Sequence, residues 1–482
     1  NLIINGNGTL NVNAGYRNGI KSTDDCIIVS GTLNITSTED GIIGKDLCGV
    51  VAGDININAG SDGIKSTYDT DTTKGNVIIE GGNITIKASN DGIQAENILV
   101  INDGTINIKT NNGAADTTQT HTDNMYMGRG GFGFNNNKTT TTRDDTAESR
   151  KGIKAGNMLI INDGDITIDS DDDSVHCNSE IYIYGGTINA ATGDDGVHAD
   201  DLLTVNGGTI NITQCYEGIE ADDIVINDGD ISVVSSDDGI NSSDGSITIN
   251  GGNLLINASG DGLDANGSII INGGYIVVLG PTSDGDTAID YDDSCTINGG
   301  TVMAFGSSGM LEIPKGASNG ACIVTAFTSV SGGSKYTLSD SNGNEILSYT
   351  PSKAYAAAIV YSDKITTGNT YDITAGSTTL SIEVTSDVTS NVSSGLGKAG
   401  GMNMPGNGGS GMPNNGSSDN GMNGNSNGSM PDMSGNGAPD MNGNSSGDMP
   451  SMGGNSSNNG GNMPNMNNGS SNGSAPQMNN RM

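Results

Sequence analysis

Residues 204–222 read TVNGGTINITQCYEGIEAD, and two close copies follow at residues 225–243 (VINDGDISVVSSDDGINSS) and 248–266 (TINGGNLLINASGDGLDAN). A glycine that follows an acidic residue marks the same place in each copy. Between residues 155 and 312 this marker recurs every 21 to 23 residues, for example at positions 196, 218, 239 and 262. Self-similarity at a fixed period of this length predicts a solenoid, in which each copy forms one coil that stacks on the next.

The apolar residues within one coil indicate which kind of solenoid this is. They occur in pairs spaced two residues apart, and Gly, Asn and Asp residues separate the pairs. This alternation is typical of short β-strands bounded by turns, and no window has a helical period. Three strands per coil, each stacked on its equivalent about 4.8 Å away, predict an all-β parallel β-helix. In the coil after Gly196 the six apolar residues are Val197, Ala199, Leu203, Val205, Ile210 and Ile212.

Composition divides the chain into three regions. Coils are recognisable across residues 1–314, with a Gly-, Thr- and Asn-rich insertion at 113–150 that is either a functional loop or a disordered decoration. Residues 315–388 still read as β-strands, and we expect a small β-rich module that caps the stack; a separate ligand-binding module is the alternative. Residues 389–482 are rich in Gly, Asn, Ser and Met and have few charges, which predicts a disordered tail.

Charge and hydropathy limit the possible partners. The formal net charge of −37 excludes a general nucleic-acid-binding surface, which needs a basic footprint. No apolar run reaches the roughly 18 residues that a membrane span needs. The sequence opens part-way through a coil, so we expect an export signal upstream and an extracellular or cell-surface location. Cys26 and Cys48 fall at the same place in neighbouring coils, where they form either a buried thiol stack or a disulfide.

The acidic residues recur at fixed places in the repeat, so stacking should align them in a ladder. From residue 155 to residue 314 the sequence has 28 Asp and Glu residues and no Lys or Arg. Two carboxylates about 5 Å apart repel by roughly 1 kcal/mol even in water. Because no side chain in this span supplies a counter-ion, we expect Ca²⁺, which prefers oxygen ligands; a solvated acidic face screened by salt is the alternative. The candidate metal ligands are Asp172, Asp173, Asp194, Asp195, Glu217, Asp237, Asp238, Asp261 and Asp264.

A few residues near this ladder are candidates for contacts with a ligand. His176 and His198 lie two residues after the marker in successive coils, where they can hydrogen-bond the acids or ligate a metal. Tyr182 and Tyr184 are candidates for sugar contacts, although the chain has no Trp and only four Phe residues to offer flat stacking surfaces. The candidate ligand-binding residues are therefore Tyr182, Tyr184, His176 and His198.

An Asp-Gly pair at 238–239, followed one coil later by Asp-Gly-Leu-Asp at 261–264, resembles the primary calcium site of the family 9 polysaccharide lyases. Those pectate lyases are right-handed parallel β-helices, and an Asp-Gly and an Asp-Asp-Gly-x-Asp supply four aspartates. Asp238, Asp261 and Asp264 match three of them, whereas Gly260 stands where the fourth is expected. The repeat and its Gly/Asn/Met-rich tail are also similar to clostridial-type β-helix carbohydrate-binding proteins related to these lyases. This resemblance implies calcium and the binding of acidic sugars and cellulose.

The physical argument favours a calcium-dependent binder of acidic polysaccharide such as polygalacturonate, with cellulose implied by the resemblance alone. A pectate-lyase-like enzyme is one alternative, since such lyases combine Ca²⁺ with a Lys or Arg base. The candidate bases are Lys154 and Lys65, and no lysine occurs between Lys154 and Lys315. Binding is therefore favoured over catalysis. A structural or adhesive surface fibre is the other alternative.

Overall fold

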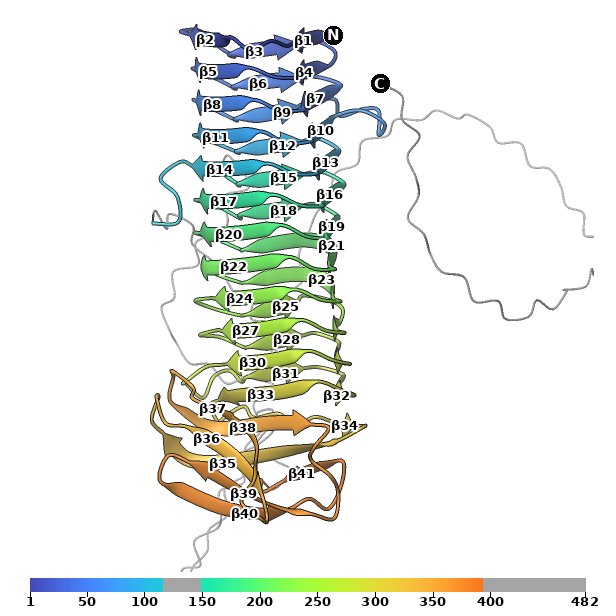
Figure 1. Cartoon of the computed structure of the whole chain (residues 1–482), viewed down its shortest axis with the longest axis vertical. Coiled ribbons are helices and arrows are strands. Elements are labelled where there is room, and N and C mark those ends of the chain that lie inside the picture. Colours follow the sequence, from blue (N-terminus) through green and yellow to red (C-terminus); the bar gives the residue numbers. More distant parts are fainter. Residues whose placement is uncertain (116–148, 393–482) are drawn as a thin grey trace, which may run out of the picture. The chain divides into compact units, whose positions relative to one another are not determined.

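A computed structural model describes residues 1–115 and 149–392 of the chain (Figure 1). These residues form β-strands joined by turns and contain no helix. Coils stack in chain order from β1 to β33, and strands pair in parallel with their equivalents in the next coil. The predicted parallel β-helix is confirmed. Residues 116–148 of the predicted insertion and 393–482 of the predicted tail lie outside the described residues, so those two predictions stay predictions.

Three strand positions recur along the coils and give the solenoid three faces, which we call A, B and C. Face A consists of β2 (Thr9–Ala14), β5 (Thr32–Ser37), β8 (Asp54–Ala59), β11 (Asn83–Ala88), β14 (Thr105–Thr110), β17 (Asp165–Ser170), β20 (Thr187–Thr192), β22 (Thr209–Gln214), β24 (Asp230–Val234), β27 (Asn253–Asn257), β30 (Tyr275–Leu279) and β33 (Thr301–Gly306). Face B contains β3 (Ile20–Ser22), β6 (Ile42–Gly44), β9 (Ile64–Ser66), β12 (Ile93–Ala95), β15 (Ile153–Ala155), β18 (Val175–Cys177), β25 (Ile240–Ser242), β28 (Leu263–Ala265) and β31 (Ile289–Tyr291). Face C contains β1 (Leu2–Ile4), β4 (Cys26–Ile28), β7 (Leu47–Val50), β10 (Asn76–Ile79), β13 (Ile98–Ile101), β16 (Met158–Ile161), β19 (Glu180–Ile183), β26 (Ile247–Ile249), β29 (Ser268–Ile271), β32 (Ser294–Ile297) and β34 (Gly316–Ala317).

Two coils depart from the predicted three short strands. In these coils β21 (Val197–Val205) and β23 (Ile219–Ile226) each run through faces B and C as one strand, with a register shift between them after Ala199. Faces B and C therefore belong to a single sheet in this part of the stack.

The interior of the stack is a continuous column of aliphatic side chains. On face A, Ile106, Ile166 and Ile188 lie in register and are fully buried, whereas the alternating residues Thr167 and Asn189 lie on the outer surface. Burying one such aliphatic side chain contributes about 1.5–3 kcal/mol, and one coil alone has nothing to bury it against. The stack is therefore stabilised coil by coil.

The close approach of neighbouring coils requires glycine at the marker position. A Cβ at Gly196 would lie 2.5 Å from the carbonyl oxygen of Gly218 and 2.5 Å from Cδ1 of Ile212. Ser174 stands at the marker position of its coil, and in that coil Ala190 takes the place of Ile212 in the register of face A. The shorter side chain of Ala190 leaves room for the serine, so the two exceptions compensate each other.

The parallel stack ends where β38 (Tyr355–Ser362) pairs antiparallel with β33 and with β35 (Ala321–Val330). The outward side chains of the last face A strands, among them Val277, Met303 and Phe305, pack with Tyr336 in a second hydrophobic core. Residues 315–388, predicted as a β-rich capping module, are thus made of strands; the boundaries of that module stay a prediction. Its other strands are β36 (Tyr336–Asp340), β37 (Glu345–Tyr349), β39 (Thr370–Ala375), β40 (Thr378–Glu383) and β41 (Val388–Ser390).

All six cysteines are buried free thiols. Cys26 and Cys48 lie in register on β4 and β7, and of the two alternatives the structure has the thiol stack. Burial raises the pKa of Cys26 to about 11. The described residues also include no helix that could cross a membrane.

Candidate functional site

The acid ladder is a column of side chains one residue before the marker, at the turn between faces A and B. In most coils a backbone N–H of the next coil donates to the ladder carboxylate: the N···O distances are 3.1 Å from Asp195 to Asp173, 3.2 Å from Glu217 to Asp195 and 2.6 Å from Asp261 to Asp238. One carboxylate oxygen therefore holds the next coil, and the other can face a cation. The ladder consists of Asp40, Asp62, Asp91, Lys151, Asp173, Asp195, Glu217, Asp238 and Asp261.

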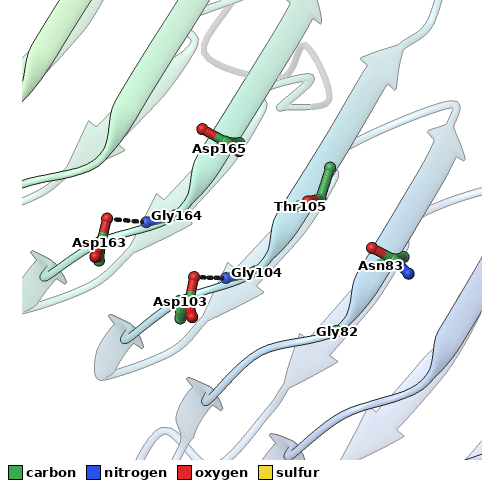
Figure 2. Close-up of a pocket in the computed structure, with 8 residues that line it drawn as sticks. All are labelled: Gly82, Asn83, Asp103, Gly104, Thr105, Asp163, Gly164 and Asp165. Atoms are coloured by element: carbon green, nitrogen blue, oxygen red, sulfur yellow. Dashed lines mark hydrogen bonds between the residues drawn. The ribbon is translucent and has the colours of Figure 1, made fainter.

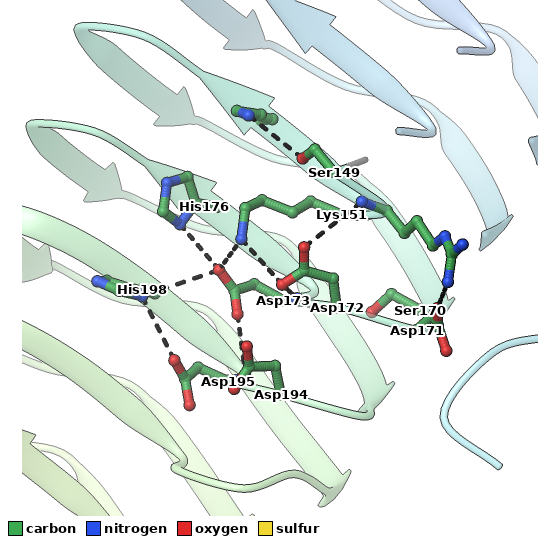
Figure 3. Close-up of polar contacts among 12 residues, drawn as sticks. Ser149, Lys151, Ser170, Asp171, Asp172, Asp173, His176, Asp194, Asp195 and His198 are labelled. Atoms are coloured by element: carbon green, nitrogen blue, oxygen red, sulfur yellow. Dashed lines mark hydrogen bonds and ion pairs between the residues drawn. The ribbon is translucent and has the colours of Figure 1, made fainter. Parts of the chain in front are cut away.

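Lys151 occupies the ladder position in the coil that precedes Asp173 (Figure 3). Its Nζ lies 2.5 Å from Asp173 Oδ2 and 3.0 Å from Asp172 Oδ1, and all three side chains are buried. Arg150 Nη1 lies 2.8 Å from Asp171 Oδ2. Burial raises the pKa of Asp173, but the charge of Lys151 outweighs burial and holds this pKa well below its usual range. The expectation that no side chain neutralises the ladder is therefore wrong for these three aspartates.

The two histidines lie in register on face B and point toward the ladder (Figure 3). His176 Nδ1 is 2.8 Å from Asp173 Oδ2, and His198 Nδ1 is 3.3 Å from Asp195 Oδ2 and 3.4 Å from Glu220 Oε2. Burial lowers the pKa of His198, but the hydrogen bond with Asp195 and the charges of Asp173 and Glu220 outweigh it and raise this pKa to about 10. The predicted contacts between histidines and acids are therefore present.

Beyond His198, no ion pair among the described residues neutralises the ladder. Burial and the charges of Asp195 and Glu220 raise the pKa of Glu217 to about 10, although Asn241 Nδ2 donates to Glu217 Oε2 at 2.8 Å. Burial also raises the pKa of Glu220, to about 8, against the opposing effect of His198. This half of the ladder therefore favours a bound proton or a bound cation.

Asp238, Asp261 and Asp264, which we call the aspartate triad, are the most concentrated part of this half. One carboxylate oxygen of each lies within 4.8 Å of the others. Burial and the neighbouring carboxylates raise the pKa of Asp238 to about 8, of Asp261 to about 9 and of Asp264 to about 7. Without a cation, the fully ionised triad is costly.

Gly260 departs from the lyase pattern, and a side chain there would meet two carboxylates of the preceding coil. A Cβ at this position would lie 2.4 Å from Asp238 Oδ1 and 2.5 Å from Asp237 Oδ1. The carboxylates of the preceding coil occupy the space that a fourth aspartate would need. Asp237 thus borders the triad without belonging to it.

Two charged residues near the ladder escaped the sequence analysis. Lys151 precedes the span in which basic residues were counted, and only the stacking of coils places it against Asp173. Asp290 lies in register with Asp264, and its charge contributes to the raised pKa of Asp264. Asp290 was missed because its coil lacks the acid-Gly marker, although its spacing of two residues after Ala288 was a usable signal.

The remaining candidates lie in different surroundings. Asp172, Asp173 and Asp194 each place an oxygen within 4.8 Å of the others, but Lys151 already contacts the first two. Lys65 Nζ lies 2.6 Å from Asp62 Oδ2, and the lysine pKa is raised because this contact outweighs burial.

Lys154, the other candidate base, contacts a hydroxyl group rather than an acid of the triad. Its Nζ lies 3.2 Å from Ser149 Oγ. In the register of face B, the coils of His176, His198 and Glu220 separate Lys154 from the triad. The structure therefore brings neither candidate base to the triad.

The tyrosines belong to face C rather than to the ladder. The rings of Tyr182 and Tyr184 are stacked, with centroids 6.5 Å apart and an interplanar angle of 17°. Tyr184 is 52% exposed, and Tyr182 OH donates to Glu180 Oε2 at 2.8 Å. In register with Tyr182 lies the half-buried Ile160, which extends the apolar surface beside the rings.

A surface pocket of about 310 Å³ lies where faces C and A meet (Figure 2). The Asp103 and Asp163 carboxylates in it accept hydrogen bonds from the backbone N–H of Gly104 and Gly164, at 2.7 and 2.8 Å. These aspartates stabilise their own turns, which explains their recurrence without a ligand.

Taken with its fold, this site places the protein among solenoids that present a regular array of polar groups along a stack of coils. One family model matches the chain twice, over residues 1–196 and 194–384, and the family is described as carbohydrate-binding domain-containing protein. The chain belongs to this family, and a polysaccharide is the partner that membership supports. No curated protein and no solved structure matches the chain.

Proposed function

We propose that this protein binds an acidic polysaccharide, such as polygalacturonate, through Ca²⁺ held by the aspartate triad, outside the cell or at its surface. The observation that carries the proposal is the triad itself: three half-buried carboxylates from two coils converge without a basic partner among the described residues. Membership of a carbohydrate-binding family supports a carbohydrate as the ligand.

The donor set of the triad fits Ca²⁺ better than it fits other common ions. All of its ligand atoms are carboxylate oxygens, which calcium and magnesium prefer. Calcium takes six to eight oxygen ligands at about 2.3–2.6 Å in flexible geometry, and three carboxylates leave several positions open. Uronate carboxylates of a polysaccharide are suitable ligands for those positions. An acidic chain can thus bind to an acidic protein.

A β-elimination enzyme receives less support from the same contacts. A base must be deprotonated to accept the C5 proton of a uronate. The pKa values of Lys65 and Lys151 are raised, because each lysine contacts carboxylates that outweigh burial. Both amines therefore hold their protons at neutral pH. Binding needs no base and is the function we propose.

A neutral polysaccharide is a second class of ligand, and we assign its binding to a different surface of the protein. The stacked Tyr182 and Tyr184 on face C offer the apolar contact that sugar rings favour. The resemblance to clostridial-type proteins implies cellulose binding. We assign this binding to the tyrosines and not to the triad. Tyr184→Ala should weaken retention on cellulose and leave retention on polygalacturonate unchanged.

Pull-down on insoluble polygalacturonate tests the main proposal. We expect retention in Ca²⁺ and release by a chelator. Asp261→Asn should weaken calcium-dependent retention about tenfold or more, because ligand charge sets calcium affinity. Asp244→Asn, which removes one exposed charge outside the triad, should retain the polymer like the wild-type chain. Retention unaffected by chelator and by Asp261→Asn would contradict the proposal. A chelator that lowers the melting temperature of a protein without retention would instead support a surface fibre.

A further inference from the structure

We propose that Asp173, His176 and His198 form a second metal site, which takes a transition-metal ion of the Zn²⁺ class rather than calcium. One ligand atom of each residue lies within 4.8 Å of the other two (Figure 3). The site shares no residue with the aspartate triad, and the inference does not depend on the proposed function.

The two imidazole rings present the same nitrogen to the ladder, although their planes are inclined by 77° and their centroids lie 4.9 Å apart. Each directs Nδ1 toward the carboxylates of the ladder and Nε2 toward an oxygen outside it. His176 Nε2 lies 2.8 Å from Asn178 Oδ1, and His198 Nε2 lies 3.6 Å from Asp200 Oδ1. Since an amide oxygen can only accept, the contact with Asn178 places a proton on His176 Nε2, and Nδ1 is the nitrogen that faces the ladder. Metal-binding histidines are commonly held by such a contact from their other nitrogen.

His176 Nδ1 is an orphaned buried atom. The side chain is only 9% exposed, and no hydrogen bond satisfies Nδ1, although Asp173 Oδ2 lies 2.8 Å away. In the neutral ring this nitrogen and the carboxylate oxygen are two acceptors, which repel each other unless a proton or a metal ion lies between them. A cation that both atoms ligate removes the repulsion.

The separations suit ligands that share one small ion. With bonds of about 2.0–2.1 Å, tetrahedral Zn²⁺ ligands lie roughly 3.3 Å apart. His176 Nδ1 to Asp173 Oδ2 is 2.8 Å, and His198 Nδ1 to Asp173 Oδ2 is 3.8 Å. Two imidazole nitrogens and one carboxylate are ligands typical of zinc, whereas calcium prefers oxygen alone.

Charged residues around the site orient one ligand and balance the charge of a bound ion. Lys151 Nζ contacts the same Asp173 oxygen and the neighbouring Asp172, which fixes the orientation of the ligating carboxylate. Asp195 Oδ2 and Glu220 Oε2 lie 3.3 and 3.4 Å from the same His198 Nδ1 that faces Asp173. These carboxylates offset the added charge of a divalent ion, and the fourth position is left for solvent.

Titration of the full chain with Co²⁺ in excess Ca²⁺ tests the site. After chelator treatment and dialysis into Ca²⁺, we expect one equivalent of Co²⁺ to give the visible absorption of a four-coordinate complex, and Zn²⁺ to displace it. His176→Gln and His198→Gln should abolish the absorption. Asn178→Ala, which removes the partner of Nε2, should weaken metal affinity about 10- to 100-fold. Asp244→Asn should bind as the wild-type chain does.

Three results would overturn the inference. One is the absence of stoichiometric uptake in the wild-type chain. Another is uptake that persists in the His176→Gln/His198→Gln double variant, which would assign the metal to the cysteines or to other residues. The third is an ¹⁵N spectrum in which both rings stay doubly protonated with Zn²⁺ present. Urea denaturation without metal checks that each variant folds, and Asn178→Ala keeps the test valid if a histidine variant does not.

Discussion

At the scale of single residues, the ladder divides into two electrostatic halves. Lys151 and the histidines compensate the carboxylates of the coils around Asp173, whereas Glu217 and the triad have raised pKa values. The change occurs within one coil because face B carries His198 in one coil and Glu220 in the next. One column of similar acids thus supports two kinds of chemistry.

Replacing Lys151 should reveal how much the first half depends on it. Lys151→Met leaves Asp172 and Asp173 buried with less compensation, and removing one partner of a buried ion pair costs about 3–5 kcal/mol. We expect the free energy of unfolding in urea to fall by this amount. Lys154→Met is the control, because Lys154 contacts only a hydroxyl and should change stability by about 0.5 kcal/mol or less. Equal losses in the two variants would show that Lys151 contributes no special compensation.

The raised pKa values of Glu217, Asp238 and Asp261 predict how stability depends on pH. In a chelator, the folded protein keeps protons on these groups that the unfolded chain, with carboxyl pKa values of about 4, has already lost. Folding therefore takes up protons, and the stabilising contribution present below about pH 4 is lost as pH rises toward about 9. Calcium should flatten this decline, since it replaces the protons. Melting temperatures measured from pH 5 to pH 9, with and without Ca²⁺, check this; parallel curves would contradict it.

At the scale of elements, the strands owe their register to side-chain sizes that match between coils. The marker glycines lie against β-branched residues of face A, and Ser174 is tolerated because Ala190 is small. This dependence is local, and it can be tested without touching any charged residue.

Ala190→Ile should destabilise the stack, because the larger side chain meets the Cβ of Ser174. Overpacking of this kind costs about 1–3 kcal/mol. The double variant Ala190→Ile/Ser174→Gly restores the combination found in other coils and should recover most of the loss. Urea denaturation of the two single variants and the double variant measures the coupling. Additive effects would mean that the two positions do not interact.

At the scale of the whole molecule, the period of the sequence was enough to predict the coils, because each strand pairs only with its equivalent one period away. The ladder was also predictable, since a fixed position becomes a column once coils stack. The partner of Asp173 was not, because Lys151 departs from the pattern at a ladder position. The members of the triad could be predicted from the spacing of the aspartates in the repeat. The steric conflict that a side chain at position 260 would meet could not be predicted, because it depends on where the Asp238 and Asp237 carboxylates lie.

The sequence also indicates that other strands cover the last strands of face A. Outward positions that hold Asn or Thr in most coils become Val277 and Leu279, and then Met303 and Phe305, so alternation gives way to continuous apolar runs. Such runs indicate a strand buried on both faces. The reversal of direction at β38 was not predictable, because the pattern within a strand is the same for parallel and antiparallel pairing.

Ending the chain at residue 314 should therefore make it self-associate. The truncation exposes Met303, Phe305 and Val277, and it leaves the edge of β33 unpaired. Exposed strand edges and apolar patches promote association. Light scattering should show larger species for the truncated chain than for the full chain at equal concentration. A truncated chain that scatters like the full chain would show that this region is dispensable for solubility.

The backbone hydrogen bond that most ladder carboxylates accept needs an acceptor but no charge. Asn18, an uncharged member at the start of the same column, already accepts the backbone N–H of Asp40 at 3.2 Å. Asparagine can therefore replace aspartate while the architecture persists in coils where no buried lysine pairs with the carboxylate, and aspartate can return as easily. Ion sites in this protein can be gained or erased one coil at a time during evolution, independently of the scaffold that carries them.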